Sequence, residues 1–286
     1  MPEESHPPSR SRITGQIGPL VSCNTGRRPK RKSDIYASVV RNAEILTPNL
    51  GPVVRYGRDF AREAAFFNAV LHRYRAHPYL VLDAGCGDCT LTRHLAHYHY
   101  RITAFDRDER MIPASENLPG NVSFLNSDIS ELNGKYDGLI ASNSVLNYSR
   151  DMSDAEKFLR EANRLLKQFG ILIIEVTNYD NPDIGSRDVC YPYGRLCSKT
   201  KRADVHLRSI VNGHTNELVF LYALGKKRRT EKMNLLIIRR SQALRLLQRT
   251  GFHQVASYGD YSLDDEHGSA SKTMIIVARK TRLPPT

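Results

Sequence analysis

Short apolar runs alternate with amphipathic stretches through the first half of the chain. Between residues 60 and 72, Phe60, Ala64, Phe67 and Leu71 recur at the spacing of a helix that covers a core. The run 79–83 is short, apolar and ended by a glycine loop, which is typical of a buried parallel strand. A helical pattern then returns over residues 90–97. This order predicts a strand between two helices.

The same alternation continues to residue 176. Further strands are predicted at 101–106, 121–125, 137–143 and 171–176. Before the last of these, Ser153 and Glu156 form a capping box that predicts a helix start, and Gly170 predicts its end. Strands that alternate with helices at short spacing favour right-handed crossovers. The sequence therefore predicts an α/β fold with a doubly wound, mostly parallel sheet.

The pattern changes after residue 180. Residues 205–212, 216–224 and 232–239 are β-rich with no helix between them, and a basic turn at 225–230 separates the last two as in a hairpin. Ser241 then predicts the start of a helix, followed by strands at 252–258 and 274–278. We interpret 181–240 as an antiparallel β insertion, acting as a substrate lid or a dimer contact. The core then comprises 51–180 and 241–282.

Basic residues are concentrated in two places. The chain carries a formal net charge of +12, and the surplus lies within residues 1–50 and 181–250. The first segment is rich in Pro, Ser, Arg and Gly and contains the run Arg27–Lys32, so we expect a flexible basic arm. A basic surface attracts an anionic substrate, a phosphate backbone or an acidic partner, or is merely a solvated face.

Composition excludes several classes of protein. No apolar run approaches the roughly 20 residues of a membrane span, and the first thirty residues lack the apolar centre of a secretory signal. Five cysteines without an export signal favour a reducing compartment. We therefore expect a cytoplasmic protein, or a nuclear one if the basic run acts as an import signal in a eukaryotic cell. Cys86 and Cys89 lack a second pair at metal-site spacing, so no metal is expected.

The loop after the first predicted strand carries the candidate chemistry. Gly85 and Gly87 let the backbone turn sharply and let a ligand approach main-chain atoms. Asp106 ends the next strand about 20 residues further on, where an acid can accept ribose hydroxyls. Asp128 follows the third strand, and the backbone N–H of Ile129 can meet an adenine edge. Together these features predict a nucleoside-containing cofactor.

The same loop argues against a dinucleotide. A third glycine is missing after Gly87, and a pyrophosphate tolerates a neighbouring carboxylate poorly. Asp83 and Asp88 instead suit a cofactor with sulfonium and ammonium groups. The loop therefore favours a cationic cofactor.

Longer runs carry a family resemblance. VLDAGCGDCTLTRHLA, ITAFDRDERMI, SFLNSDI and DGLIASNSVLNY resemble class I S-adenosylmethionine-dependent methyltransferases, and most of all the small-molecule group that includes glycine N-methyltransferase. The resemblance covers about residues 55–180 and the C-terminal strands. It implies a Rossmann-like fold and S-adenosyl-L-methionine as cofactor. One departure is Cys89, which stands where the family usually has a third small residue.

The resemblance also implies roles for individual residues. Gly85 and Gly87 line the methionine part, Asp106 holds the ribose, Asp128 and Ile129 meet the adenine, and Ser142 and Asn143 lie near the transferred methyl. In the run from 55 to 64, Arg62 matches an arginine that pairs with the cofactor carboxylate. The full expected cofactor set is Tyr56, Arg62, Asp83, Gly85, Cys86, Gly87, Asp106, Arg107, Asp128, Ile129, Ser142 and Asn143.

Methyl transfer from a sulfonium is an in-line displacement, so the enzyme mainly aligns the reactants and excludes water. A base is needed only if the acceptor binds protonated. The candidates are Tyr148, just after the fourth strand, and His206 or His214 in the insertion. Tyr191 and Tyr193 are candidates for lining the pocket. Each of these side chains is equally compatible with packing or surface exposure.

The acceptor class is inferred by elimination. The chain lacks the Asn/Asp-Pro-Pro-aromatic run of enzymes that methylate base amino groups, a Pro-Cys nucleophile for cytosine carbon, and paired glutamates for protein arginine. A small molecule under the insertion remains, and the basic surplus favours an anionic one. The alternatives are an RNA methyltransferase that uses the basic arm and insertion, and a non-catalytic cofactor-binding module.

Overall fold

The structure is a computed structural model of the 286-residue chain. It describes residues 58–75, 77–108, 118–185, 187–198, 201–224, 227–265 and 270–281. The expected basic arm at 1–50 lies outside these residues. Side chains at 187–198, 201–206, 221–224, 227–229 and 231 are likewise outside the description. Within the described part, no helix is both long enough and apolar enough to cross a membrane.

A seven-stranded sheet forms the centre of the molecule. Its strands are β1 (Leu80–Ala84), β2 (Arg101–Asp106), β3 (Val122–Asn126), β4 (Tyr136–Ala141), β5 (Leu166–Thr177), β10 (Phe252–Gly259) and β11 (Thr273–Lys280). They are ordered β10-β11-β5-β4-β1-β2-β3. Strands β1 to β5 pair in parallel, whereas β11 is antiparallel to β5 and to β10. The predicted doubly wound, mostly parallel sheet is confirmed.

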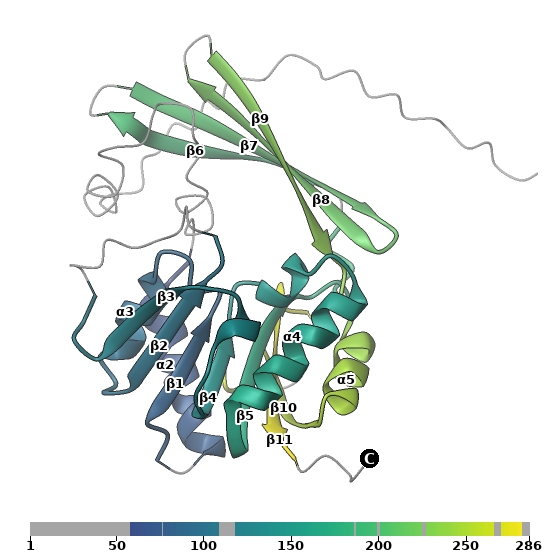
Figure 1. The fold of residues 1–286 in the computed structure, drawn as a ribbon. Helices are drawn as coiled ribbons and strands as arrows, with labels where there is room; N and C mark the ends of the chain where they lie inside the picture. The colour runs from purple at the N-terminus through teal and green to yellow at the C-terminus, as the bar shows by residue number, and fades with distance from the viewer. Residues whose placement is uncertain are drawn as a thin grey trace, which may run out of the picture.

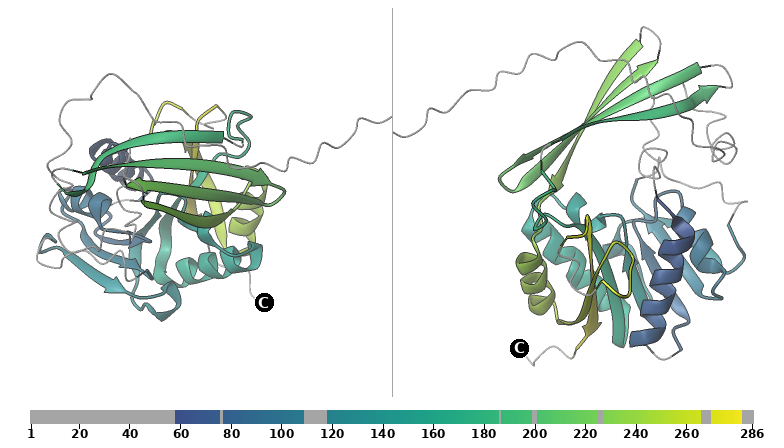
Figure 2. Two further views of the ribbon diagram at one scale, coloured as in Figure 1. Left: turned by 90° about the horizontal axis from the view of Figure 1, so that it is seen from above. Right: turned by 180° about the vertical axis from the view of Figure 1, so that it is seen from behind.

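Helices cover both faces of this sheet (Figures 1 and 2). Helices α2 (Phe60–Tyr74) and α3 (Thr90–Ala96) pack with the sheet in one apolar core, and α4 (Met152–Leu165) and α5 (Arg240–Arg249) pack in the other. Helix α2 approaches β4 closely, because a Cβ at Gly138 would lie 2.5 Å from Cδ2 of Leu71. The two cores pack against the two faces of the sheet, and the carboxyl ends of the parallel strands β1 to β5 lie together along one side of it, the carboxyl edge.

Four long strands form a second, antiparallel sheet above that edge (Figure 1). These are β6 (Arg187–Ser198), β7 (Lys201–Asn212), β8 (Thr215–Leu224) and β9 (Lys227–Leu236), in that order. The side-chain amide of Asn147 donates to the backbone oxygen of Leu236 over 2.8 Å and ties the end of β9 to the core. Strand β6 was not predicted, because Pro192 and Gly194 interrupt its pattern. Its position at the sheet edge tolerates a proline.

Three predicted helix boundaries were wrong. Helix α4 is capped by Asp151, whose carboxylate accepts from the Asp154 N–H over 2.8 Å, and not by Ser153. It ends at Leu165, before Gly170, because the chain enters β5 directly. Helix α5 begins after Arg239 and not after Ser241. Competing polar residues within one turn of each other make such caps hard to choose from sequence.

Candidate functional site

The loop after β1 is bent by three residues with left-handed backbone. Gly85, Gly87 and Cys89 have φ values of 63°, 55° and 58°. A Cβ at Gly85 would lie 2.6 Å from Cγ2 of Val145, so only glycine fits against the segment that follows β4. The N–H of Cys86 donates to the Phe105 oxygen over 3.0 Å, which fastens the loop to β2. The thiols of Cys86 and Cys89 are free and lie 3.1 Å apart.

Asp83 precedes this loop and is only 1% exposed. One oxygen, Oδ2, accepts from the Thr92 hydroxyl over 2.5 Å. The other, Oδ1, is buried and has no hydrogen-bond partner among the described residues. Burial raises the pKa of Asp83 to about 7, against the opposing effects of the Thr92 hydrogen bond and the Arg58 charge, and the Asp106 charge raises it further. A buried oxygen without a partner is costly, so this carboxylate suits a ligand donor.

The acids at the ends of β2 and β3 lie beside the loop. Asp106 accepts from the Gly87 N–H through Oδ2 and from the Asp108 N–H through Oδ1, each over 2.9 Å. Asp128 caps a short 3-10 helix, Ile129–Glu131, by accepting from the Ser130 N–H over 3.0 Å. The Ile129 side chain is buried, whereas Arg107 is exposed. The structure therefore brings Asp106 to the glycine loop and fixes Asp128 at the next strand end.

Strand β4 ends in a strained turn. Asn143 and Ser144 have φ values of 55° and 61°, which non-glycine residues seldom adopt. The Asn143 N–H donates to Oε2 of Glu175 over 2.7 Å, and the hydroxyls of Ser144 and Thr177 lie 3.1 Å apart. Ser142, before the turn, is 7% exposed. Strained residues that surrounding contacts hold in place are concentrated at functional sites.

The structure distinguishes two arginines near the start of α2. Arg62 is exposed, and its guanidinium donates to the backbone oxygen of Asp260 over 3.1 Å. Arg58 instead forms an ion pair with the buried Glu63, donating from both Nε and Nη2. Burial lowers the pKa of Arg58, but the hydrogen bond to Glu63 and the charges of Tyr261 and Glu175 outweigh it and raise the pKa. The charge of Arg58 also acts on Asp83 and Tyr148, whereas the family resemblance implied Arg62 as the partner of the cofactor carboxylate.

A signal for Arg58 was present in the sequence. Asp59 caps α2 by accepting from the Arg62 N–H, so Arg58 precedes the helix while Arg62 lies in its first turn. A side chain before the cap can fold back over the sheet edge.

Of the three catalytic candidates, the structure describes the side chains of Tyr148 and His214 but not that of His206. Burial raises the pKa of Tyr148; the charge of Asp106 raises it further and that of Arg58 opposes the rise, so this phenol lies within the field of the site. His214 is exposed in the turn between β7 and β8, and its backbone oxygen accepts from Ile237. His206, Tyr191 and Tyr193 lie on the second sheet with side chains outside the description, and Tyr56 lies outside the described residues.

Two further residues of the site were missed from the sequence. Glu175 is 4% exposed on β5, and its Oε2 accepts from the Tyr261 hydroxyl over 2.6 Å. The signal was a carboxylate inside the apolar run 171–176, since a buried acid needs partners. Tyr261 had no comparable signal, because its role depends on a contact with a distant strand.

The donor set fits a ligand that carries positive charge and hydroxyl groups. Asp83 offers an unpartnered buried oxygen, and Asp106 lies close enough to raise its pKa. A cationic ligand group would relieve the repulsion between these carboxylates. S-Adenosylmethionine carries an ammonium, a sulfonium and ribose hydroxyls, so its chemistry suits this edge. Among the described residues, no cluster of three or more His, Cys, Asp and Glu could hold a metal ion.

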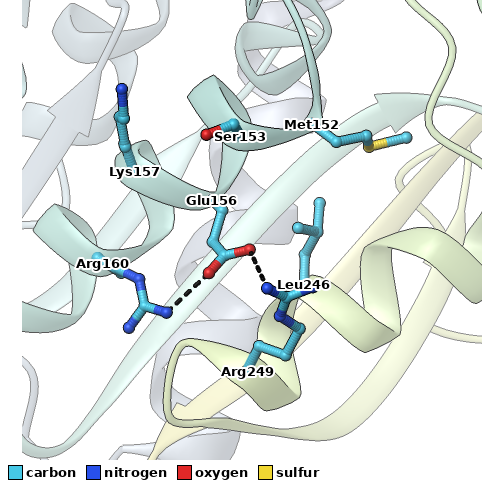
Figure 3. A pocket seen from close by; sticks show the side chains of 7 residues that line it. All are labelled: Met152, Ser153, Glu156, Lys157, Arg160, Leu246 and Arg249. Atoms are coloured by element: carbon cyan, nitrogen blue, oxygen red, sulfur yellow. Dashed lines mark hydrogen bonds and ion pairs between the residues drawn. The ribbon is translucent and has the colours of Figure 1, made fainter.

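A groove of about 450 Å³ lies elsewhere, between α4 and α5 (Figure 3). In it, Glu156 accepts from Arg160 over 2.7 Å and pairs with Arg249 over 3.1 Å. The Glu156 carboxylate thus has two arginine partners, whereas Oδ1 of Asp83 has no hydrogen-bond partner among the described residues. The groove therefore belongs to the packing of two helices rather than to the carboxyl edge.

Comparison with known proteins agrees with this geometry. Residues 81–170 match the sequence profile of a methyltransferase domain family. A glycine/sarcosine N-methyltransferase of Parasynechococcus marenigrum is 30% identical over 145 residues, which cover 50% of this chain and 48% of that protein. The chain thus spans about half the length of the curated relatives it matches.

Solved structures share the fold. A S-adenosylmethionine-dependent methyltransferase of Clostridium acetobutylicum has a TM-score of 0.67 at 17% identity, covering 81% of this chain and 96% of that chain. The sugar N-methyltransferase KedS8 of Streptoalloteichus has a TM-score of 0.67 at 16% identity, covering 93% of this chain and 100% of that chain. At these identities the likeness establishes the fold alone.

Proposed function

We propose that the chain, whose residues 81–170 match a methyltransferase domain family, is a class I S-adenosylmethionine-dependent enzyme that methylates a nitrogen of a small-molecule acceptor. The observation that carries the cofactor part of the proposal is Oδ1 of Asp83, which is buried near the carboxyl end of β1 and has no hydrogen-bond partner among the described residues. The carboxyl edge is where open α/β sheets bind ligands.

The cofactor, when bound, supplies an electrophilic methyl group on a sulfonium. Asp83 would accept a hydrogen bond from the ammonium through Oδ1, and Asp106 would accept from the ribose hydroxyls. Gly85 and Gly87 would let the backbone approach the methionine part, and Asp128 and Ile129 would meet the adenine. Charge-assisted bonds of this kind contribute roughly 1.5–3 kcal/mol each.

Arg58 takes the cofactor carboxylate in place of Arg62. Its guanidinium lies within the field of Asp83 and Tyr148, whereas the guanidinium of Arg62 is engaged with the Asp260 backbone. A guanidinium can hold a carboxylate bidentately. In this role Arg58 exchanges part of its bond with Glu63 for the ligand.

The acceptor enters between the turn after β4 and the second sheet, which acts as a lid. Ser142 and Asn143 would border the methyl group. Because burial raises the pKa of Tyr148, its phenol stays protonated and would orient an amine that binds as the free base rather than take its proton. An amine acceptor agrees with the names of two similar proteins, a glycine/sarcosine and a sugar N-methyltransferase. The carboxylate of Glu175 would also favour an amine over an anionic acceptor.

RNA methylation is the second candidate. The basic surplus between residues 181 and 250 would then track a phosphate backbone. Binding to nucleic acid weakens steeply as salt rises, whereas binding of a small amine does not. Comparing turnover at low and moderate salt separates the two candidates.

The test uses labelled S-adenosylmethionine with fractions of a cell extract and with a panel of glycine, sarcosine and amino sugars. We expect label in the small-molecule fraction, and loss of labelling in Asp106→Ala together with about 100-fold weaker cofactor binding, because two hydrogen bonds disappear. Label found in RNA or protein would refute the proposed acceptor class. Unchanged affinity in Asp106→Ala would refute the cofactor site.

A further inference from the structure

We propose that Tyr261 is a positioning residue of the methyl-transfer site, acting through Glu175 on the turn that follows β4. The proposal rests on the function proposed above and adds a residue from the segment between β10 and β11. Tyr261 itself touches neither loop glycine among the described contacts.

Tyr261 stands in a turn that is held from several sides. Asp260 and Tyr261 have φ values of 42° and 58°, two consecutive left-handed residues that are not glycine. The Asp260 carboxylate accepts from the Thr273 N–H over 3.0 Å and from its hydroxyl over 2.9 Å. The Arg62 guanidinium donates to the Asp260 oxygen from α2. Backbone strain of this kind persists only where the surrounding structure enforces it.

The turn directs the Tyr261 ring into the sheet edge. Its centroid lies 5.9 Å from that of Phe66 and 5.8 Å from that of Phe67, both edge to face. The hydroxyl donates to Oε2 of the buried Glu175 over 2.6 Å. Burial and then the Glu175 charge raise the pKa of Tyr261 well above its usual value, so the phenol remains a proton donor. The pair is therefore a lasting, directional contact.

The same oxygen of Glu175 also accepts from the Asn143 N–H over 2.7 Å. Glu175 thus joins two strained turns, one after β4 and one after β10. Two residues beyond Asn143, Val145 packs against Gly85 so closely that a Cβ there would lie 2.6 Å from its methyl carbon. A shift of the Asn143 turn is therefore passed directly to the cofactor loop.

The expected effect of Tyr261 on turnover arises from the alignment of the two reacting groups. An in-line displacement depends on the relative placement of the methyl group and the attacking atom, and a misplacement of about 1 Å costs on the order of 100-fold in rate. Without the Tyr261 hydroxyl, Glu175 keeps only the Asn143 N–H as a described donor and can turn toward the Arg58 charge. The turn after β4 then loses its fixed position while the fold is retained.

The chain offers a matched control in Tyr258. Its ring also meets Phe66 edge to face, at 5.5 Å, and its hydroxyl lies 2.7 Å from that of Tyr74. Tyr258→Phe and Tyr261→Phe therefore each remove one hydrogen-bonded hydroxyl from beside the same ring. Only Tyr261 is bonded to Glu175.

The experiment compares wild type, Tyr261→Phe and Tyr258→Phe by hydrogen–deuterium exchange of residues 142–148 and by calorimetric affinity for S-adenosylhomocysteine. In Tyr261→Phe we expect at least about 5-fold faster exchange and about 3- to 10-fold weaker binding, the effect of one lost hydrogen bond. In Tyr258→Phe both quantities should stay within about twofold, although this variant also loses the hydrogen bond from Arg73 over 3.2 Å and should lose at least as much thermal stability as Tyr261→Phe.

With any acceptor that the wild type methylates, Tyr261→Phe should lower kcat by about 10-fold or more with a smaller change in KM. Equal exchange and affinity in the two variants would overturn the proposal. A wild type that binds S-adenosylhomocysteine but methylates no acceptor would instead refute the proposed function. The exchange and affinity comparison would still decide the role of Tyr261.

Discussion

Two buried aspartates lie at opposite ends of neighbouring strands of the same sheet, and their pKa values shift in opposite directions. Asp137 begins β4 and accepts from the N–H groups of Tyr79 and Leu80, from Arg75 and from Lys167, over 2.9 to 3.1 Å. Among the described residues, Asp83, near the carboxyl end of β1, has one hydrogen-bond partner, Thr92, and its Oδ1 has none. The two carboxylates are almost equally buried, at 4% and 1% exposed.

Their pKa values express this difference. Burial tends to raise the pKa of Asp137, but the bonds from Leu80, Lys167, Tyr79 and Arg75 outweigh it and lower the pKa to about 2. At Asp83 the effect of burial exceeds that of the Thr92 hydrogen bond and the Arg58 charge and raises the pKa to about 7. The amino-terminal edge therefore uses its acid to stabilise the fold. The carboxyl edge holds an acid whose partners are incomplete, as expected of a ligand site.

Removing Asp137 should give the largest effect on stability. Asp137→Ala leaves two backbone N–H groups and two cations without their acceptor, which costs about 3 kcal/mol. Denaturant unfolding measures the loss, and calorimetry with S-adenosylhomocysteine should show unchanged affinity for the folded protein. A stable variant with lost affinity would reverse the assignment of the two edges.

Asp83→Asn should weaken cofactor binding and leave stability unchanged or higher, the opposite of Asp137→Ala. The amide keeps the shape of the acid but not its charge, so we expect about 10- to 30-fold weaker cofactor binding from the loss of one charge-assisted bond. Stability at pH 8 should stay the same or rise, since a buried charge is removed. A large loss of stability with normal binding would show that Asp83 is structural.

The two arginines near α2 should differ in cofactor binding. Arg58→Lys retains the charge but loses bidentate geometry, and we expect about 10-fold weaker binding. Arg62→Lys should change affinity by less than about twofold, because Arg62 is exposed and bonded to a backbone oxygen. The reverse order of effects would restore Arg62 as the carboxylate ligand.

Asp137 and Asp83 should contribute to the pH dependence of stability with opposite signs. The lowered pKa of Asp137 means that its contribution is present above about pH 4 and is lost as the pH falls toward 2. The raised pKa of Asp83 means that its own contribution to stability is greatest below about pH 4, declines as the pH rises from about 4 to about 7, and changes little above that. Thermal melts of Asp83→Asn should lack the second decline. An unchanged pH profile would contradict the raised pKa.

The sequence predicted the parts of the molecule that depend on local pattern. Apolar runs such as 101–106 became strands at their predicted positions, and the glycines of the loop bend it as required. Boundaries that depend on competing polar side chains, such as Ser153 against Asp151, were wrong. Strand β6 was missed because Pro192 contradicts a strand unless the strand lies at an edge.

The hydrophobic pattern of the sequence could not predict contacts between distant segments. Asp83 and Asp106 follow from strand ends, which neighbour each other in any parallel sheet. The junction of Tyr261, Glu175 and Asn143 joins three segments whose register no periodicity reveals. Arg58 precedes the helix and Arg62 lies in its first turn because Asp59 caps α2, and the sequence offers few other signs that separate the two arginines. The placement of Asp83 and Asp106 at neighbouring strand ends was therefore predictable, and the contacts of Tyr261 and Glu175 were not.

The most direct test of the account is hydrogen–deuterium exchange with and without S-adenosylhomocysteine, read at both edges of the sheet. We predict protection at 83–90, 104–108, 126–131 and 142–148, because the ligand binds where these segments converge. Residues 78–81, 135–138 and 166–170, around Asp137, should exchange at the same rate with and without ligand. Protection at the Asp137 edge, or none at the carboxyl edge, would contradict the account.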